Sequence, residues 1–335
     1  MPNPSGGPEL ETEKPFFNVI NALEHFEREA RDYLAQNGCK LLDIYLKVLP
    51  EEKRCTAVRG IDAVIAGGEE WSEKVFEAAD KLKIVARSGT GYDKVDLTGA
   101  TRRGVWVTNT PGGPGPAVAD FAVGLILCLL RNIPMMAQGL KEGRWEPLSG
   151  RELGTITVGV IGVGNVGREI VRRVRGGFGS KVLGYDAYPD QNLARQEQVK
   201  YVPLDELLAE SNVVVLAVPL NEETKDLIDR RKLRMMRKDA YLINVARPGI
   251  VVKTDLVECL RAQEIAGAAV DVHDPAPSLP GDPLIQLPNV LGTPWAAFYT
   301  QEAVRRMNME AARQVLSVLK GGKPTFPVNS LNGSQ

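Results

Sequence analysis

Three glycines in the middle of the chain have the spacing G-x-G-x-x-G, at Gly162, Gly164 and Gly167. They follow residues 157–161, whose apolar and β-branched composition predicts a strand, and a helical pattern begins directly after them. In such a turn the first glycine permits the tight bend, the second admits a pyrophosphate to the backbone, and the third lets helix and strand approach. The spacing therefore predicts a dinucleotide-binding loop, with Asn165 and Val166 presenting the N–H groups of the helix N-terminus to the phosphates.

An acidic residue lies at the position expected for the group that binds the ribose of a dinucleotide. A second predicted strand, residues 181–185, ends at Asp186, 19 residues beyond Gly167. A carboxylate there binds the ribose hydroxyls and repels a 2′-phosphate, so the pattern favours NAD over NADP. A purely structural glycine turn with a surface aspartate is the alternative, but strand, spacing and acid together favour the cofactor.

The elements that must position this loop form two α/β series. Before residue 110 the predicted strands alternate with helices, at residues 23–36 and 72–82, and a Gly/Pro cluster at residues 111–116 marks a crossover. We expect Pro116 to open a long apolar helix over residues 117–131. Predicted strands lie at residues 16–20, 41–46, 63–66, 84–86 and 105–108, and then at residues 157–161, 181–185, 213–218, 241–245, 267–272 and 290–291. The second series predicts a Rossmann-type doubly wound parallel sheet, and a final helix is expected over residues 301–320.

Composition excludes several classes of function. A net charge of -1 offers no basic surface for nucleic acid or an anionic membrane, and the longest apolar run, residues 121–130, is far short of the roughly 20 residues of a membrane span. Four scattered cysteines and two histidines favour a cytoplasmic protein with reduced thiols and no metal site. The first 14 residues lack the apolar segment of a signal peptide and predict a frayed tail.

Further segments carry a family resemblance. They are residues 84–93 (IVARSGTGYD), 107–112 (VTNTPG), 117–120 (AVAD), 244–247 (NVAR) and 293–294 (TP). In this order, with the glycine loop among them, the chain resembles the D-isomer-specific 2-hydroxyacid dehydrogenases, in particular the branch similar to phosphoglycerate dehydrogenase. The resemblance implies a smaller, flavodoxin-like α/β substrate (catalytic) domain of residues 1–110 and 300–335, and an NAD-binding Rossmann domain of residues 111–299. It also implies a homodimer held largely by the cofactor domains.

The resemblance also implies roles for individual residues. Arg247 would hold the carboxylate of a small substrate and polarise its carbonyl, a task that suits a guanidinium. Backbone N–H groups of Thr90 and Gly91 would bind the same carboxylate. Asp271 would hold the nicotinamide amide, and Pro219 and Thr224 match positions near the cofactor.

The pattern breaks at the acid/base pair. Ala276 stands where family members place a Glu, and Trp295 stands where they place a His. Alanine cannot orient a base, and indole offers only an N–H donor. Since a positioned acid or base typically contributes about 10²–10⁴-fold in rate, the usual mechanism cannot run unchanged.

Three interpretations remain open. In a repurposed enzyme another group handles the proton, His273 first, because it follows the strand at residues 267–272 at the edge where cofactor chemistry occurs. For that histidine by itself, a packing role beside the cofactor domain is the favoured interpretation. In a formate-type oxidation no proton relay is needed, and Trp295 would shape and dry the site. In a catalytically silent protein, NAD(H) binding would serve sensing or partner binding.

Two acids, Glu69 and Glu70, follow the strand at residues 63–66 and disfavour a phosphate-bearing substrate, although a solvated loop is the favoured interpretation. Trp71, Trp106 and Trp145 are interpreted as packing residues.

Overall fold

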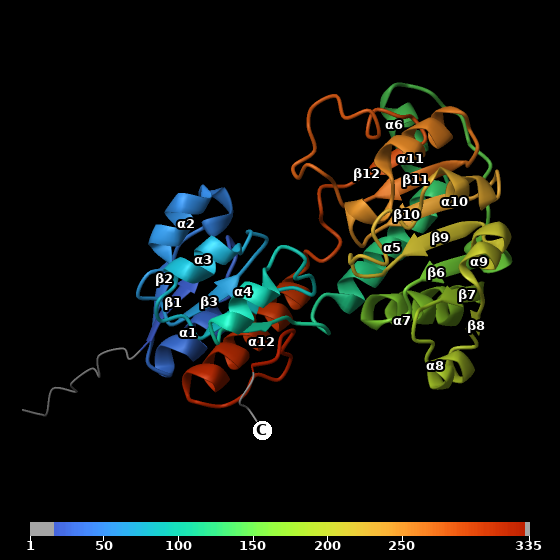
Figure 1. The fold of residues 1–335 in the computed structure, drawn as a ribbon. Coiled ribbons are helices and arrows are strands. Elements are labelled where there is room, and N and C mark those ends of the chain that lie inside the picture. Colours follow the sequence, from blue (N-terminus) through green and yellow to red (C-terminus); the bar gives the residue numbers. More distant parts are fainter. Residues whose placement is uncertain (1–16, 332–335) are drawn as a thin grey trace, which may run out of the picture. The chain divides into compact units, whose positions relative to one another are not determined.

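The computed structural model describes residues 17–331 and divides the chain into two compact units. Unit 1 comprises the residues up to Thr110 together with those from Val304 onward, and unit 2 is Pro111–Ala303. The predicted N-terminal tail lies outside the described residues. Each unit is a parallel sheet with helices on both faces (Figure 1), which confirms the predicted fold class.

Unit 1 is built on a five-stranded sheet in the order β2-β1-β3-β4-β5, with every neighbouring pair parallel. This is the flavodoxin-like order. Its strands are β1 Phe17–Asn21, β2 Cys39–Asp43, β3 Ala63–Ala66, β4 Ile84–Arg87 and β5 Trp106–Thr108. Strand β3 is buried along its whole length, because helices cover both faces of a parallel sheet.

The helices of unit 1 form two layers. α1 (Arg28–Gln36) and α12 (Gln301–Leu319) pack on one face of the sheet. α2 (Glu51–Ala57), α3 (Glu73–Ala78) and α4 (Leu97–Arg102) pack on the other. Helices α1 and α3 are both shorter than predicted. In the case of α1, residues 22–27 form a loop, and the Ala22 N–H donates to the Ile65 carbonyl of β3.

Unit 2 carries a seven-stranded sheet in the order β12-β11-β10-β9-β6-β7-β8, again with parallel pairs throughout. Counted from β6, this is the Rossmann order 3-2-1-4-5-6 with one further strand, β12. The strands are β6 Thr157–Ile161, β7 Lys181–Tyr185, β8 Lys200–Tyr201, β9 Val213–Leu216, β10 Tyr241–Asn244, β11 Gly267–Val270 and β12 Val290–Gly292. The sequence missed β8, because two residues are too short to show an alternating pattern.

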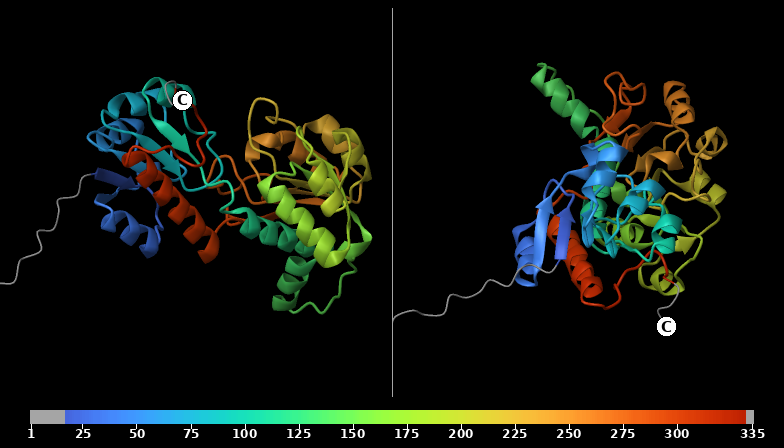
Figure 2. Two further views of the ribbon diagram at one scale, coloured as in Figure 1. Left: turned by 90° about the horizontal axis from the view of Figure 1, so that it is seen from below. Right: turned by 60° about the vertical axis from the view of Figure 1, so that its left-hand side comes forward.

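Two hydrophobic layers flank this sheet. α5 (Gly115–Leu130) and α7 (Asn165–Arg172) cover one face, whereas α9 (Leu204–Glu210), α10 (Arg230–Met235) and α11 (Lys253–Arg261) cover the other. The remaining helices of unit 2 are α6 (Ile133–Lys141) and α8 (Gln191–Gln196), and Figure 2 shows α6 leaving the body of the unit. Pro116 lies in the first turn of α5, as predicted.

Among the described residues, no single helix has the length and apolar character needed to cross a membrane. Helices α5 and α6 meet those criteria only as a pair, and they bend by 63° at their junction.

Candidate functional site

The space around each glycine of the loop after β6 is different. Gly162 has a φ of +88°, and a Cβ on it would lie 2.6 Å from Val218 Cγ1. A Cβ on Gly167 would lie 1.9 Å from the carbonyl oxygen of Gly162, which explains the close approach of α7 to the strand. A Cβ on Gly164 would meet nothing within 4 Å. The first and third glycines therefore serve packing, and the second borders open space.

Helix α7 begins at Asn165, directly after this space. The N–H groups in the first turn of a helix have no partner within the helix, so Asn165 and Val166 present donors beside Gly164. Together with the partial positive charge of the helix N-terminus, they form an anion-binding arrangement suited to a pyrophosphate. The loop thus fits the cofactor predicted for it.

Asp186 is bound to the glycine loop itself. Its Oδ2 accepts the Val163 N–H at 2.7 Å, and its Oδ1 accepts the Tyr188 N–H at 2.9 Å. Each carboxylate oxygen has a further lone pair, so the side chain can still accept hydrogen bonds from ribose hydroxyls. The parallel pairing of β6 and β7 brings their carboxyl ends, and hence the loop and the acid, together.

A second group of side chains lies at the carboxyl ends of β10, β11 and β12, on the same edge of the sheet as the glycine loop. Arg247 follows β10, and its guanidinium carbon lies 6.0 Å from the ring centroid of Trp295, which follows β12. This is a cation–π distance. Arg247 Nη1 also donates to the carbonyl of Ala246 at 2.8 Å. The guanidinium therefore contacts the indole ring of Trp295 on one side and donates to a backbone carbonyl on another.

The backbone of Trp295 is in the left-handed region, with a φ of +58°, which is unfavourable for a bulky residue. Its N–H donates to the carbonyl of Asp271 at 2.9 Å. Such a conformation persists only where the surroundings enforce it, and it directs the indole toward Arg247.

Hydrogen bonds to Asp271 hold the loop of Trp295 in this conformation. Asp271 is 1% exposed, and its carboxylate accepts hydrogen bonds from Thr293 Oγ1 at 2.7 Å, Ala296 N at 2.8 Å and Ala297 N at 2.9 Å. One buried charge thus builds the whole loop that carries Trp295. The sequence assigned Asp271 to the nicotinamide amide, and the structure shows a structural use for both of its oxygens.

His273 is half-buried and sits two residues beyond Asp271. Its Nε2 lies 2.7 Å from the carbonyl oxygen of Thr293. Because a carbonyl only accepts, Nε2 carries the proton and Nδ1 is left as the atom that can take up or release one. Among the described residues Nδ1 has no hydrogen-bond partner.

Ala276 lies on an exposed loop between β11 and β12. Lys253 of α11 fixes this loop by donating to the Asp274 carbonyl at 3.2 Å and to Asp282 at 2.6 Å. Burial, the largest effect, raises the pKa of Asp282, but the hydrogen bonds from Lys253, the Leu284 N–H and Ser278, together with the Lys253 charge, lower it below its ordinary value. Alanine thus offers no proton-transfer group at this position.

Pro219 and Thr224 belong to one exposed turn after β9. The Thr224 hydroxyl donates to the Pro219 carbonyl at 2.6 Å and accepts the Asn221 N–H at 2.9 Å. The structure therefore places Thr224 as the residue that closes the turn, and its contact with the cofactor stays a prediction.

In unit 1, hydrogen bonds to three of its carbonyl groups fix the loop after β4. Gly89 O accepts from Thr110 N at 3.0 Å, Thr90 O from Asn109 Nδ2 at 2.9 Å, and Gly91 O from Arg87 Nε at 2.9 Å. The N–H groups of Thr90 and Gly91 donate to no described residue. Three anchored carbonyls thus leave two donors available to an anion.

Sequence reasoning did not assign roles to Asn109 or Arg87, although both lie in segments it singled out. Gln314 of α12, which is 1% exposed, extends the same chain by donating to the Asn109 carbonyl at 2.9 Å. No local sequence pattern could have identified the role of Gln314, because its partner Asn109 is 205 residues away in the chain.

Two packing expectations were wrong. Glu69 is not a solvated loop residue: it is 3% exposed and accepts hydrogen bonds from Gly67 N and Trp71 Nε1, at 2.9 and 3.1 Å. Trp145 is not a packing residue, because 87% of it is exposed. Trp71 is buried against Phe76, as expected, and Glu70 is exposed.

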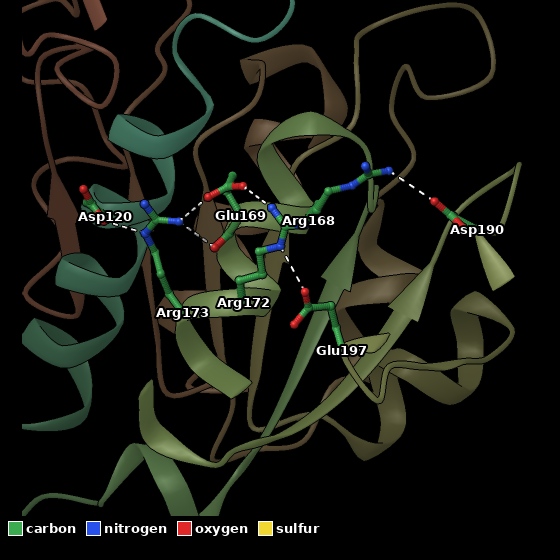
Figure 3. Close-up of polar contacts among 7 residues, drawn as sticks. All are labelled: Asp120, Arg168, Glu169, Arg172, Arg173, Asp190 and Glu197. Atoms are coloured by element: carbon green, nitrogen blue, oxygen red, sulfur yellow. Dashed lines mark hydrogen bonds and ion pairs between the residues drawn. The ribbon is translucent and has the colours of Figure 1, made fainter. Parts of the chain in front are cut away.

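A network of ion pairs lies along α7, behind the glycine loop (Figure 3). Arg173 bridges Asp120 of α5 and Glu169, and Arg172 bridges Glu169 and Glu197. Chiefly the Arg173 hydrogen bond holds the pKa of Glu169 below its ordinary value, despite an opposing effect of burial. The carboxylate of Asp120 is engaged by Arg173 in this network.

No metal-binding group of three or more His, Cys, Asp or Glu occurs within residues 17–331. The four cysteines are free, and burial raises the pKa of the Cys39 and Cys259 thiols to about 11. These two thiols are therefore protonated and unreactive at neutral pH.

Comparison with known proteins identifies relatives of both units. Residues 123–297 match the family described as "D-isomer specific 2-hydroxyacid dehydrogenase, NAD binding domain". The chain is 36% identical over 306 residues to a D-3-phosphoglycerate dehydrogenase of Archaeoglobus fulgidus, covering 90% of this chain and 57% of that protein. It thus spans little more than half the length of that relative.

Other matches extend over most of both partners. A glyoxylate reductase of Korarchaeum cryptofilum is 36% identical over 297 residues, covering 86% of this chain and 89% of that protein. Among solved structures, a D-lactate dehydrogenase from Aquifex aeolicus in complex with NAD and lactic acid aligns with a TM-score of 0.79. That match has 25% identity and covers 91% of this chain and 96% of the other.

Proposed function

This chain belongs to the D-isomer-specific 2-hydroxyacid dehydrogenase family, and we propose on that premise that it transfers a hydride between NAD(H) and carbon 2 of a small 2-oxo or 2-hydroxy acid. The observation that carries the proposal is the position of Arg247. It brings a cation to the same sheet edge as the glycine loop, where ligands bind in open α/β sheets.

The cofactor contacts follow from the loop geometry. The open space at Gly164 and the donors at Asn165 and Val166 would receive the pyrophosphate, and Asp186 would accept from the ribose hydroxyls. Bound there, NADH supplies the hydride for reduction of the substrate carbonyl.

Substrate binding is assigned to two sets of donors. The guanidinium of Arg247 would bind the carboxylate and polarise the neighbouring carbonyl. In unit 1, the N–H groups of Thr90 and Gly91 are assigned as donors to a substrate carboxylate, and the anchored carbonyls of their loop would keep these donors in a fixed direction. Trp295 would cover one flank of Arg247 and exclude water from it.

We assign the proton to His273. During reduction, carbon 2 would gain a hydride and the carbonyl oxygen would gain the Nδ1 proton of an imidazolium, which leaves a neutral ring whose Nε2–H donates to the Thr293 carbonyl. In the oxidative direction Nδ1 accepts the hydroxyl proton. Ala276 has no ionisable group and Trp295 has only an N–H, so neither replaces the histidine and glutamate that the resemblance implies.

A panel assay tests the proposal. NADH oxidation is followed by absorbance with 2-oxo acids, and NAD reduction with 2-hydroxy acids, aldehydes and formate. We expect turnover on a small 2-oxo acid, and His273→Ala should lower kcat by about 10²–10⁴-fold without changing NADH affinity. Tight NADH binding without turnover on any compound would instead support a catalytically silent NAD-binding protein, and turnover on formate alone would support the proton-independent reaction.

A homodimer is part of the same proposal. The segment around α6 exposes apolar side chains on unit 2: Ile133 at 47%, Met135 at 54%, Leu140 at 57% and Trp145 at 87%. A second copy of the chain would cover this surface. Sedimentation equilibrium should give twice the chain mass, and Trp145→Ser should shift it toward the monomer. A monomeric wild-type chain would contradict the proposal.

A cytoplasmic location completes the proposal, because four free cysteines suit a reducing compartment. Fractionation of cells expressing the chain checks it.

A further inference from the structure

An ion pair beside the cofactor loop has no role in the function proposed above. Arg168 directly follows Gly167 in α7, and its Nη2 lies 3.3 Å from Asp190 Oδ2 (Figure 3). Asp190 lies four residues beyond Asp186, on the loop that leads from β7 into α8. The pair therefore connects the helix that faces the pyrophosphate to the loop that carries the ribose-binding acid.

The two oxygens of Asp190 have separate partners. Oδ1 caps α8 by accepting from Asn192 N at 2.9 Å and Leu193 N at 3.1 Å, and Oδ2 takes Arg168. The cap, chiefly the Leu193 N–H, lowers the pKa of Asp190 together with the Arg168 charge, although burial opposes it. The carboxylate is thus ionised at neutral pH and holds the arginine.

Arg168 has hydrogen-bonding capacity that Asp190 does not use. Its Nε is buried and has no hydrogen-bond partner within residues 17–331. The hydroxyl of Tyr201, on β8, is also buried. Burial raises the pKa of Tyr201, and the charges of Asp186, Asp190 and Arg168 all act on it. These four side chains therefore lie within electrostatic range of one another.

Such a set of groups discriminates between phosphorylated and unphosphorylated ribose. NADP differs from NAD by a 2′-phosphate, which a guanidinium binds well and a carboxylate repels. Here the guanidinium of Arg168 is already paired with the Asp190 carboxylate, which offsets its charge.

We propose that Asp190 is a second determinant of the preference for NAD over NADP, acting by holding Arg168. Asp186 repels the 2′-phosphate directly, and Asp190 withholds the cation that would bind it. The inference rests on the cofactor role proposed for the glycine loop and Asp186, and not on the substrate or on His273.

The pair is suited to mutagenesis because it contributes little to the fold. Both side chains are partly exposed, at 38% and 40%, and exposed ion pairs add little stability. Asparagine caps helices as well as aspartate does, so Asp190→Asn removes the charge and keeps the α8 cap. Arg168→Gln removes the proposed phosphate-binding cation.

The experiment measures binding of NADH and NADPH by titration calorimetry to the full chain, with 5′-AMP and adenosine 2′,5′-bisphosphate as probes of the ribose end. Asp190→Asn should tighten NADPH binding about tenfold and leave NADH affinity unchanged. The gain should disappear in the Asp190→Asn, Arg168→Gln double variant, and it should shrink as salt rises. Glu197→Gln is the matched control, because it removes a carboxylate that pairs with Arg172 on the same helix.

Three results would overturn the proposal. The first is an unchanged ratio of NADPH to NADH affinity in Asp190→Asn. The second is a gain that persists without Arg168, since it would reflect the lost negative charge alone. The third is an equal gain in Glu197→Gln. Absence of turnover on any substrate would count against the proposed function and leave these binding measurements valid, whereas a failure of the wild-type chain to bind NADH would count against the cofactor loop.

Discussion

Replacing Asp271 by asparagine tests whether one buried carboxylate builds the loop that carries Trp295. The substitution keeps the shape of the side chain but turns one acceptor oxygen into an NH2 group. The carboxylate accepts from Thr293 Oγ1, Ala296 N and Ala297 N. In either orientation of the amide, the NH2 group therefore faces at least one backbone N–H.

The magnitude follows from these contacts. A hydrogen bond to a charged acceptor contributes about 1.5–3 kcal/mol, and a buried donor left without a partner costs about 1–3 kcal/mol. At least one such bond is lost at a residue that is 1% exposed, so Asp271→Asn should lower the free energy of unfolding by about 2–4 kcal/mol. For a domain of this size that corresponds to a fall in Tm of roughly 4–16 °C.

Thermal unfolding followed by circular dichroism measures the loss, and tryptophan fluorescence reports on Trp295. Thr293→Val removes a single hydroxyl bond and should cost about 1 kcal/mol. Asp274→Asn, at an exposed position two residues before Ala276, is the matched control and should leave Tm unchanged. If Asp271→Asn kept the wild-type Tm and lost NADH affinity, the structural role would be refuted and the nicotinamide contact favoured.

Three further predictions concern the glycine loop and the substrate groups. Gly167→Ala should destabilise the chain by about 1–3 kcal/mol, because its Cβ would lie 1.9 Å from a carbonyl oxygen. Gly164→Ala should keep the wild-type Tm and lose NADH affinity, because a Cβ there would enter the open space assigned to the pyrophosphate. If Gly164→Ala lowered Tm and Gly167→Ala did not, the assigned roles would be contradicted. Arg247→Lys should raise KM for a 2-oxo acid about tenfold or more with NADH affinity unchanged, and an unchanged KM would remove the carboxylate role. The Trp295→His, Ala276→Glu double variant should gain ordinary 2-hydroxyacid turnover, and if it gains none, the pocket itself differs from that of the family.

Local patterns were enough to predict the fold class. Buried parallel strands read as apolar runs, and an alternation of such runs with helices leaves few arrangements open. The glycine spacing is similarly local: Gly162 needs a positive φ and Gly167 a missing side chain, and no other residue meets these demands. The clash at Gly167 comes from Gly162, five residues before it, and the positive φ of Gly162 is a property of its own turn.

The misjudged residues depend on distant partners or on the path of a loop. The burial of Glu69 results from a loop that turns the carboxylate back onto Gly67 and Trp71. Trp145 is exposed because it lies in the irregular segment after α6, whose residues 142–150 are all exposed, although tryptophan is usually a packing residue.

The sequence by itself determined the two α/β folds, the dinucleotide loop with its acid, and the loss of the expected glutamate and histidine at Ala276 and Trp295. Only the tertiary structure decided where the side chains point. It turned Trp295 onto Arg247 through bonds to Asp271, and it fixed His273 on the Thr293 carbonyl. The reason is physical: side-chain direction in a loop depends on hydrogen bonds across about 20 residues or more of intervening chain, and no periodicity in the sequence encodes them.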